Sequence, residues 1–238
     1  MRRARAAMAV AGLLAVAAMA AMAADAVKVI TPFNGKDLAG WKLRDAPKTQ
    51  WKVGTASLDP KNPKQLVVAP EGSELVNLKA GCDLLTEAEF GDCTVQLEFM
   101  IPKGSNSGVY LMGRYEVQVL DSFGKEKDFE PGDMGGIYST AAPVKPTYKA
   151  PGEWQTLEIV FQAPRFDPPD RQAGAAGKKT ANARFVKVVL NGATIHENVE
   201  APKPTGGELG PEVAKGPLMF QGDHGPVAFR NIKIMPAP

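Results

Sequence analysis

The chain has 238 residues, with 28 Lys and Arg side chains, 26 Asp and Glu side chains and a formal net charge of +2. Three of the basic residues, Arg2, Arg3 and Arg5, lie in an N-terminal segment that we expect to be removed, which leaves 25 against 26. A near-neutral chain without a basic cluster has no electrostatic footprint for nucleic acid, which excludes a nucleic-acid-binding protein. The length suits one all-β domain, a class that often runs to about 200–250 residues.

The first 23 residues have the features of a secretory signal peptide. The three arginines are followed by an apolar, Ala-rich run at residues 6–21, and Ala21-Met22-Ala23 fits the small-x-small cleavage rule. A retained membrane anchor is the alternative, but the run is shorter than the about 20 residues of a typical span. We therefore predict a signal peptide at residues 1–23 and a single exported domain at residues 24–238. That domain would be periplasmic or secreted, with no membrane span after cleavage.

The two cysteines of the chain, Cys82 and Cys93, leave two possibilities open. An exported protein can form a disulfide, but spacing alone does not decide between a disulfide and two separate buried thiols. With only two Cys and two His in the chain, the sequence argues against a structural zinc site.

Strand patterns recur along the whole chain, and no stretch shows sustained helical periodicity. Asn191-Gly192 between two alternating runs is typical of a β-hairpin. The predicted strands are Gly40–Leu43, Gln50–Val53, Gln65–Val68, Asp83–Leu85, Thr94–Ile101, two strands within Asn106–Asp121, Trp154–Phe161, Ala183–Leu190, Ala193–Val199 and Val227–Ile234. The pattern predicts an all-β sandwich of two antiparallel sheets, with a wet, concave face on which a sugar chain can lie.

Two segments lack strand character. Phe123–Gly135 is charged and contains glycine, and we expect it to form a loop over the site. Pro164–Thr180 is rich in Pro, Gly, Ala and Lys, and its composition predicts a mobile surface excursion.

Polar residues that can do chemistry lie inside the strands of the Asn106–Asp121 hairpin. Glu116 and Gln118 share one face because side chains repeat every second residue along a strand. Asp121 would turn away on a regular strand, and a bulge or the strand end could bring it back. A carboxylate beside an amide suits a sugar site, since the amide orients a hydroxyl and the carboxylate accepts a proton. The alternative is an ordinary solvated strand face.

The two histidines differ in their local sequence. His224 lies in Gln221-Gly222-Asp223-His224-Gly225, where the glycines allow the backbone to bend. It can be a general base, a metal ligand or a hydrogen-bond donor, and the alternative is a turn histidine bonded to backbone. His196 follows the Asn191-Gly192 turn, and we expect it on the surface.

Arginines and aromatic residues complete the candidates. Arg114 and Arg230 are embedded among strand residues, where an inward arginine must pair with a carboxylate or a ligand. For Arg114, a structural ion pair is the alternative. Aromatic rings that offer stacking surfaces are Tyr110, Tyr115, Tyr138, Trp41, Trp51 and Trp154, and we expect the tryptophans to be core residues. The chain has neither a Gly-x-Ser-x-Gly nucleophile elbow nor a phosphate-binding loop.

A series of short motifs resembles the 3-keto-disaccharide hydrolase domain family, formerly a domain of unknown function, over about Phe33 to Ile234. In chain order the motifs are Asn34-Gly35-Lys36-Asp37-Leu38-x-Gly40-Trp41, Gly104-Ser105-Asn106-Ser107-Gly108-Val109-Tyr110, Tyr115-Glu116-Val117-Gln118-Val119-Leu120-Asp121, Gly136-Ile137-Tyr138, Gly152-Glu153-Trp154, Leu190-Asn191-Gly192, Gly216-Pro217-Leu218-x-x-Gln221-x-x-His224-Gly225 and Val227-x-Phe229-Arg230-Asn231-Ile232. Their shared order makes the match specific. The resemblance implies a concanavalin A-like jelly roll, in agreement with the strand pattern.

The resemblance also implies an activity, the cleavage of 3-keto-glycosides such as 3-keto-disaccharides. A ketone at C3 acidifies the C2 proton, so that a base can remove it and the C1–O bond breaks by β-elimination; water then adds to the enone. Such a route needs a base, an acid and a group that polarises the ketone, and it does not need the paired carboxylates of ordinary glycosidases. A partner sugar 3-dehydrogenase would supply the keto-sugar substrate.

Within this scheme, motif position and residue type suggest catalytic roles for Glu116, Asp121 and His224. Glu116 or Asp121 would be the base or a metal ligand, and His224 the acid or a metal ligand. No cofactor is certain, but a divalent metal ion could polarise the ketone, with the same three residues as candidate ligands. The same reasoning predicts that the substrate is bound by Gln118, Arg114, Tyr110, Tyr138, Gln221 and Arg230.

Two other readings stay open. Related glucanases carry a Glu-x-Asp-x-x-Glu strand, so this chain could be a conventional β-glucanase-like glycosidase. However, Gln118 replaces the middle acid and Asp121 the last one, which weakens that reading. A non-catalytic carbohydrate-binding module is the second alternative, because fold does not determine function.

Overall fold

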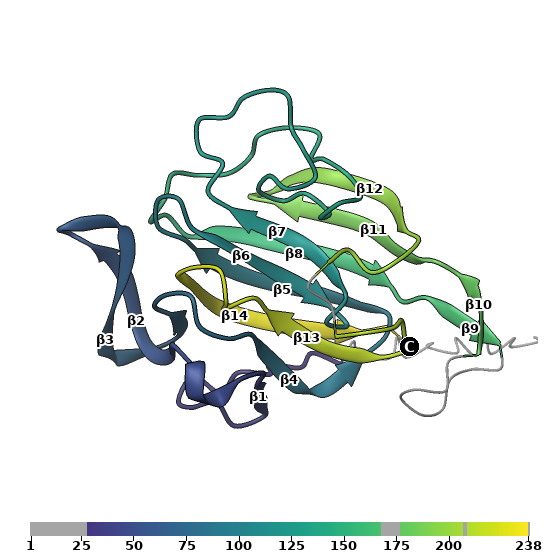
Figure 1. Ribbon diagram of the computed structural model, residues 1–238, viewed down its shortest axis with the longest axis horizontal. Coiled ribbons are helices and arrows are strands. Elements are labelled where there is room, and N and C mark those ends of the chain that lie inside the picture. The colour runs from purple at the N-terminus through teal and green to yellow at the C-terminus, as the bar shows by residue number, and fades with distance from the viewer. Residues whose placement is uncertain (1–27, 168–176, 207–208, 238) are drawn as a thin grey trace, which may run out of the picture.

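A computed structural model describes residues 28–167, 177–206 and 209–237 of the chain. The predicted signal peptide lies outside the described residues. The elements form two antiparallel sheets that pack face to face (Figure 1), as the strand pattern predicts. Within the described residues, no helix has the length and apolarity needed to span a membrane.

The smaller of the two sheets has five strands. In spatial order they are β1 (Trp41–Leu43), β4 (Leu84–Phe90), β13 (Gly216–Phe220), β6 (Asn106–Leu111) and β7 (Tyr115–Leu120). β6 and β7 are the two strands predicted for the central hairpin. β13 was not among the predicted strands, and it lies between strands that are far from it in the sequence.

The larger sheet has seven strands. In spatial order they are β12 (Ala193–Ala201), β11 (Ala183–Leu190), β8 (Gln155–Gln162), β5 (Cys93–Met100), β14 (Val227–Pro236), β3 (Asn62–Asn77) and β2 (Trp51–Asp59). β11 has the predicted bounds, and the other predicted strands of this sheet are confirmed with shifted ends. β2 and β3 are much longer than expected and form the hairpin at the left of Figure 1.

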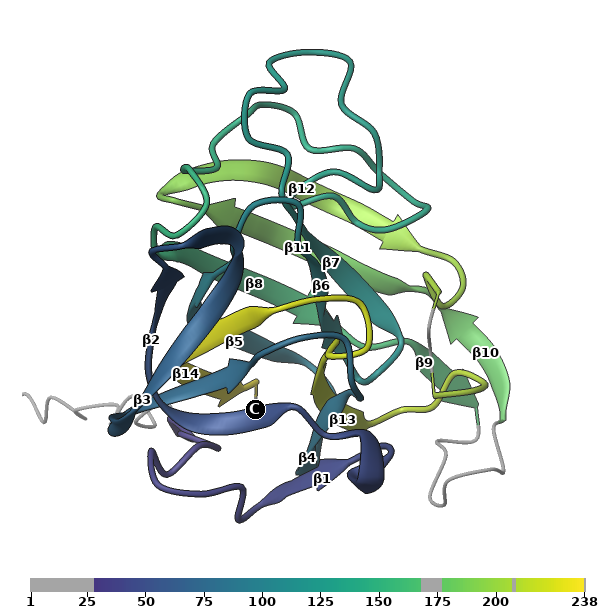
Figure 2. The same cartoon turned by 60° about the vertical axis from the view of Figure 1, so that its left-hand side comes forward.

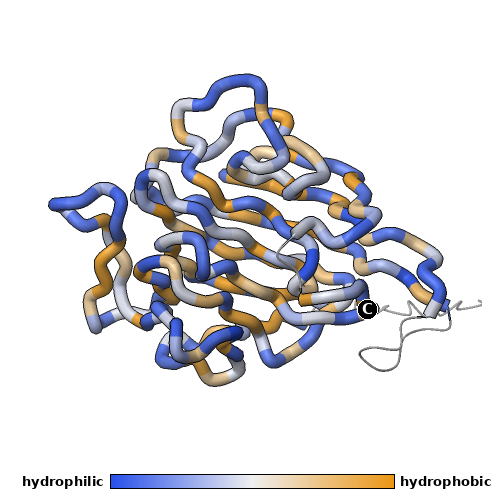
Figure 3. Tube along the Cα trace, viewed as in Figure 1, coloured by the Kyte–Doolittle hydropathy of each residue, from blue (hydrophilic) through white to orange (hydrophobic). Residues whose placement is uncertain are grey.

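The core lies between the sheets and is held by stacked aromatic rings. Phe220 of the small sheet stacks on Phe229 of the large sheet, with ring centroids 4.0 Å apart and planes 10° apart. Trp41 extends this stack on one side and Trp51 on the other. Burial of aromatic rings is the largest favourable contribution per side chain in such a core. Figure 3 shows the hydrophobic residues along the strands and the hydrophilic ones in the loops.

The segment between β7 and β8 rises beside β12, in the view of Figure 1 and in that of Figure 2. Its Val144 N–H donates to the carbonyl of Ile195 in β12. This contact joins an edge of the small sheet to an edge of the large one. The same segment covers His196, whose Nε2 atom lies 2.8 Å from the Gly135 carbonyl oxygen and which is only 3% exposed.

The expectation that His196 lies on the surface is therefore wrong, and the register of β12 gives the physical reason. Val188 of β11 pairs with His196, but the next residue, Val189, pairs with Thr194, so β12 carries a bulge. A bulge changes the alternation of side chains, and both Ile195 and His196 are buried.

Two further expectations are corrected or resolved by the structure. Part of Pro164–Thr180 is not an irregular excursion, since β9 (Arg165–Asp167) and β10 (Lys178–Ala181) pair as a small antiparallel ribbon. The residues between them lie outside the described part of the chain.

Cys82 and Cys93 are both buried and free, so the possibility of two separate thiols is confirmed. One helical turn, η1 (Ala46–Lys48), agrees with the expectation of short helical turns only.

Candidate functional site

The β6–β7 hairpin divides its side chains between the two faces of the small sheet. Val109 and Val117 oppose each other in the strand pairing and are fully buried in the core. Because side chains alternate along a strand, the next opposed pair, Tyr110 and Glu116, lies on the other face. We call this face of the five-stranded sheet, turned away from the core, the outer face of the small sheet.

The carboxylate of Glu116 occupies space that a glycine leaves open. A Cβ atom added to Gly108 would lie 2.1 Å from Oε1 of Glu116 and 2.9 Å from Cε2 of Tyr110. No side chain larger than hydrogen fits there without displacing the carboxylate. A glycine inside a strand often marks such a close approach, and here it places Glu116 directly over β6.

Burial raises the pKa of the Glu116 carboxyl from its ordinary value of 4.5 to about 7. A hydrogen bond from the Tyr110 hydroxyl and the charge of nearby His224 lower this pKa, whereas the carboxylates of Asp223 and Asp83 raise it. The side chain is only 3% exposed, so the loss of hydration dominates. A carboxyl group with a pKa near 7 can take up and release protons at neutral pH, as general acid–base catalysis requires.

Two carboxamides flank Gly108 on the same face. Gln118 lies opposite it on β7, and Gln221 follows β13, its backbone N–H donating to the Gly108 carbonyl at 3.0 Å. The Val119 N–H donates to Oε1 of Gln118 at 3.2 Å. This bond occupies the amide oxygen and leaves the N–H₂ group of Gln118 as the end that can donate to a ligand. Oε1 of Gln221 is buried and has no hydrogen-bond partner within the described residues. An unpaired buried acceptor of this kind is one that a ligand hydroxyl can satisfy.

Tyr138 lies beside Glu116 at the edge of the outer face. Ile137 pairs with Val117 of β7, and the Tyr138 N–H donates to the Glu116 carbonyl at 3.2 Å. The Tyr138 side chain is 40% exposed. The segment that follows the predicted loop Phe123–Gly135 therefore runs along the edge of β7, and its backbone places Tyr138 beside Glu116.

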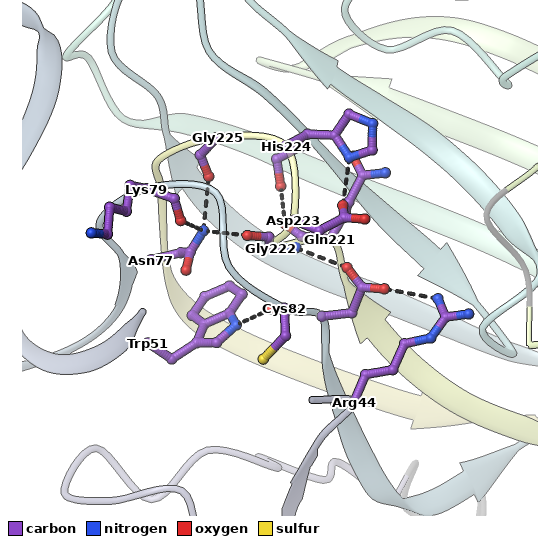
Figure 4. Close-up of polar contacts among 12 residues, drawn as sticks. Arg44, Trp51, Asn77, Lys79, Cys82, Gln221, Gly222, Asp223, His224 and Gly225 are labelled. Atoms are coloured by element: carbon purple, nitrogen blue, oxygen red, sulfur yellow. Dashed lines mark hydrogen bonds and ion pairs between the residues drawn. The ribbon is translucent and has the colours of Figure 1, made fainter. Parts of the chain in front are cut away.

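His224 comes from the turn between β13 and β14, and it is paired with its neighbour in the sequence. Its Nδ1 atom lies 2.5 Å from Oδ1 of Asp223 (Figure 4). Both side chains are about half exposed. Because a carboxylate only accepts hydrogen bonds, Nδ1 carries the proton and Nε2 is the nitrogen that can exchange one. The turn adjoins β6, because the Gln221 N–H that precedes it donates to the Gly108 carbonyl and a Cβ on Gly225 would lie 3.0 Å from the carbonyl oxygen of Asn106.

Asp121 does not join Glu116. Its Oδ2 accepts a hydrogen bond from the Gly104 N–H at 2.7 Å, and its Oδ1 accepts one from the Phe123 N–H at 3.2 Å. Both oxygens therefore bind the backbone at the end of the hairpin, a structural role.

The two predicted arginines are also held elsewhere. Arg114 is buried at the opposite end of the hairpin, and it donates to the carbonyls of Pro211 and Met112 at 2.6 and 2.8 Å. Arg230 lies on β14 in the other sheet, where it pairs with Glu98 and Glu74. Neither arginine lies in the group formed by Glu116 and its neighbours, so the structure gives no support to their predicted contact with a sugar.

The candidate metal ligands do not form a coordination set. Asp121 uses its oxygens for backbone amides, as described, and Glu116 is hydrogen-bonded to Tyr110. Across the described ranges, no group of three His, Cys, Asp or Glu side chains could hold a metal ion. The predicted set of Glu116, Asp121 and His224 therefore does not fit a metal, and no step below depends on one.

Sequence reasoning missed several residues that shape this site. Asp83 and Asp223 contribute negative charge near Glu116, and Gly108 makes its position possible. Asn106, on β6 two residues before Gly108, carries a second buried amide oxygen without a partner among the described residues. Two of these residues could have been found from the sequence. Gly108 is a glycine inside an alternating strand, and Asp223 is next to His224. No local feature of the sequence marks Asp83.

Comparisons with known proteins identify the family and the fold of this chain. Residues 28–235 match the model of a family described as the 3-keto-α-glucoside-1,2-lyase-like domain. A proposed glycosyl hydrolase from Parabacteroides distasonis ATCC 8503 is similar in structure, with a TM-score of 0.62 and 27% identity over 88% of this chain and 84% of that one. A second proposed glycosyl hydrolase from the same organism has a TM-score of 0.58 and 19% identity over 88% of this chain and 94% of that one. No curated protein matches the chain.

Proposed function

This chain belongs to the family of 3-keto-α-glucoside-1,2-lyase-like domains, and on that premise we propose that it cleaves the glycosidic bond of 3-keto-disaccharides. The family and the similarity to a proposed glycosyl hydrolase support a carbohydrate-active protein. The 3-keto substrate and the elimination mechanism go beyond that support and rest on the chemistry of the outer face.

The reaction begins at C2 of the oxidised sugar. A base removes the C2 proton, the electron pair forms the C1=C2 double bond, and the C1–O bond breaks with its electrons on the leaving oxygen. An acid protonates that oxygen, which gives the free aglycone and a 1,2-ene-3-one. Water then adds, with hydroxyl at C1 and a proton at C2, and the product is the free 3-keto sugar.

The buried carboxyl of Glu116 is the observation that carries the proposal. Its pKa of about 7 makes it a stronger base than an ordinary carboxylate and leaves a large ionised fraction at neutral pH. Burial raises its proton affinity by more than the Tyr110 hydrogen bond and the charge of His224 lower it. We assign Glu116 as the base that removes the C2 proton.

His224 and the carboxamides complete the assignment. His224, with Nδ1 oriented by Asp223, presents Nε2 as the acid for the leaving oxygen. The N–H₂ group of Gln118 can donate to the C3 ketone oxygen, where negative charge develops after proton removal. The unpaired Oε1 of Gln221 can accept from a sugar hydroxyl, and the Tyr138 ring offers a surface for stacking.

The decisive experiment follows deuterium during turnover of a 3-keto-disaccharide in D₂O. Elimination followed by hydration places solvent deuterium at C2 of the released 3-keto sugar, whereas direct displacement at C1 leaves the C2 proton in place. Samples without enzyme measure spontaneous exchange of the acidic C2 proton. Transient formation of a product lighter than the 3-keto sugar by one water would identify the enone.

Matched variants link this chemistry to the outer face. Glu116→Gln should lower turnover about 10²–10⁴-fold, the usual contribution of a general base. Glu98→Gln, on the other sheet, is the control and should leave turnover near the parent value. Turnover by Glu116→Gln at the parent rate would remove Glu116 from the mechanism.

The same assay separates the two alternative readings. Cleavage of unoxidised β-glucan would favour a conventional glycosidase, but Gln118 stands on β7 where the related glucanases carry their middle acid. Binding of either sugar without turnover would favour a carbohydrate-binding module. Export by the signal peptide, and supply of the substrate by a sugar 3-dehydrogenase in the same compartment, remain part of the proposal.

A further inference from the structure

The turn from Gly222 to Gly225 combines exposed side chains with a buried backbone. Asp223 and His224 project with side chains that are 47% and 50% exposed. The two glycines that flank them are buried. A half-exposed side chain on a surface turn normally samples several positions, so the fixed backbone beneath this pair needs an explanation.

Asn77 supplies it from the end of β3. Its side chain is fully buried, and its Nδ2 atom donates to the carbonyls of Gly222 and Gly225 at 2.9 and 2.8 Å. A third bond, to the carbonyl of Lys79, is 2.9 Å long. One amide group therefore binds both ends of the turn that presents Asp223 and His224 (Figure 4).

Other contacts hold Gly222 in the same place. Its N–H donates to Oδ1 of Asp83 at 3.1 Å, and its carbonyl accepts from the Gly81 N–H at 2.8 Å. A Cβ atom on Gly222 would lie 2.2 Å from the carbonyl oxygen of Cys82 and 2.8 Å from Nε1 of Trp51. These contacts surround the backbone of Gly222 closely and hold the turn in one position.

The amide of Asn77 donates hydrogen bonds but accepts none from the described residues. Its N–H₂ group has three acceptors, while its Oδ1 is buried without a partner among the residues described. An unpaired buried oxygen costs free energy. The side chain is therefore suited to holding the carbonyls of the turn, and not to satisfying its own polar atoms.

We propose that Asn77 is a positioning residue, which fixes the Asp223–His224 pair relative to Glu116 by binding the backbone at both ends of their turn. The effect on turnover rests on the proposed function. The effect on His224 itself does not, and it can be measured without a substrate.

Nuclear magnetic resonance gives that measurement, because the chain has only two histidines. In protein with ¹⁵N-labelled histidine at alkaline pH, His224 should show the Nδ1-protonated tautomer that Asp223 requires. Asn77→Asp keeps the shape of the side chain but places a carboxylate against three carbonyl oxygens. We expect this variant to shift His224 toward a mixture of tautomers and to leave the buried His196 unchanged.

The control is Asn191→Asp, in an asparagine that also donates to a backbone carbonyl, that of Thr147 at 2.7 Å, but on the β11–β12 hairpin. It should leave the His224 signal unchanged. If Asn77→Asp does not fold, Ser105→Ala tests the same idea more gently, because the Ser105 hydroxyl donates to the carbonyl of Pro226 just after the turn at 2.6 Å. An unchanged His224 tautomer in the folded variants would overturn the proposal.

A double-mutant cycle adds the kinetic arm. Asn77→Asp should lower kcat about 10–100-fold with little change in KM, and it should lower it much less when His224 is already replaced by Ala. Equal losses in both backgrounds would mean that Asn77 acts on stability alone and would overturn its positioning role. If the parent protein turns over no keto-sugar while the His224 signal responds as expected, the proposed function fails and the positioning role stands.

Discussion

The two outer faces of the sandwich carry similar residues with opposite electrostatics. On the small sheet, Glu116 is buried beside Tyr110, and burial raises its pKa to about 7. On the large sheet, Glu98 accepts hydrogen bonds from Arg230 and Asn231, and these partners hold its pKa below the ordinary value despite its partial burial. Arg230 also stacks over the ring of Trp154, 4.0 Å from its centroid.

The difference shows why one face is suited to chemistry and the other to stability. A carboxylate that is neutralised by an arginine has little remaining affinity for a proton. A carboxyl group whose burial outweighs its favourable partners keeps that affinity, and its burial costs stability once it is ionised. Displaced pKa values of the second kind are typical of functional sites.

The largest expected effect concerns stability as a function of pH. The folded-state pKa of Glu116 is raised, so its contribution to stability is fully present below pH 4.5 and is lost as the pH rises through about 7. Glu116→Gln should therefore raise the free energy of unfolding at pH 8 by roughly 3 kcal/mol, and have little effect near pH 4. Urea unfolding at the two pH values measures this difference.

Glu98→Gln is the opposite case and serves as the control. The pKa of Glu98 is lowered, so its stabilising contribution is present above the unfolded-state value and disappears as the pH falls through the folded-state one. This variant should lose stability at pH 8 and approach the parent protein in acid. Equal behaviour of the two variants would break the comparison between the faces.

The next effect concerns the glycine beneath Glu116. Gly108→Ala should displace the carboxylate, since the new Cβ would lie 2.1 Å from Oε1. We expect turnover of the keto-sugar to fall about 100-fold, as for other small misplacements of catalytic groups. Gly132→Ala is the control, because its Cβ would meet only the Tyr138 ring, at 3.9 Å. An active Gly108→Ala enzyme would show that the observed position of Glu116 is not the catalytic one.

A smaller effect is expected for Arg230 on the large sheet. Arg230→Met leaves Glu98 and Glu74 without their cation and removes the stack on Trp154, at a cost of about 1–2 kcal/mol in stability. KM for the keto-sugar should not change. Lys233→Met, on the same strand, controls for the loss of one charge. A raised KM in Arg230→Met alone would place the substrate on this face instead.

The smallest effect is expected for Asp121. In Asp121→Asn one amide oxygen can still accept from Gly104, so that the loss should be about 0.5–1 kcal/mol in thermal unfolding. Turnover should stay within a few-fold of the parent rate, as in the exposed-loop control Asp128→Asn. A loss as large as that of Glu116→Gln would restore Asp121 as a catalytic carboxylate.

Alternation along strands is a local property, and it made much of this protein predictable. It identified both strands of the Asn106–Asp121 hairpin and the common face of Glu116 and Gln118. The Asn-Gly turn likewise identified the β11–β12 hairpin. These features depend on backbone geometry and on neighbours in the sequence, so the amino-acid sequence alone is enough to predict them.

Features that depend on distant partners could not be read in this way. Arg230 meets Glu98 and Glu74 across 132 and 156 positions, and nothing near it in the sequence distinguishes those partners from a sugar. His196 changes from surface to interior through one bulge and a covering segment. The motif predicted Asp121 as a third site residue, but in the fold its carboxylate accepts a hydrogen bond from the Gly104 N–H.

The sequence by itself thus determined the class of fold, the family and the strand on which Glu116 lies, because periodicity and motif order are properties of the chain. Only the tertiary structure decided that burial raises the pKa of Glu116 and that Asn77, 145 positions before Gly222, holds the turn of His224. The physical reason is that proton affinity and position depend on which remote groups exclude water and which supply charge.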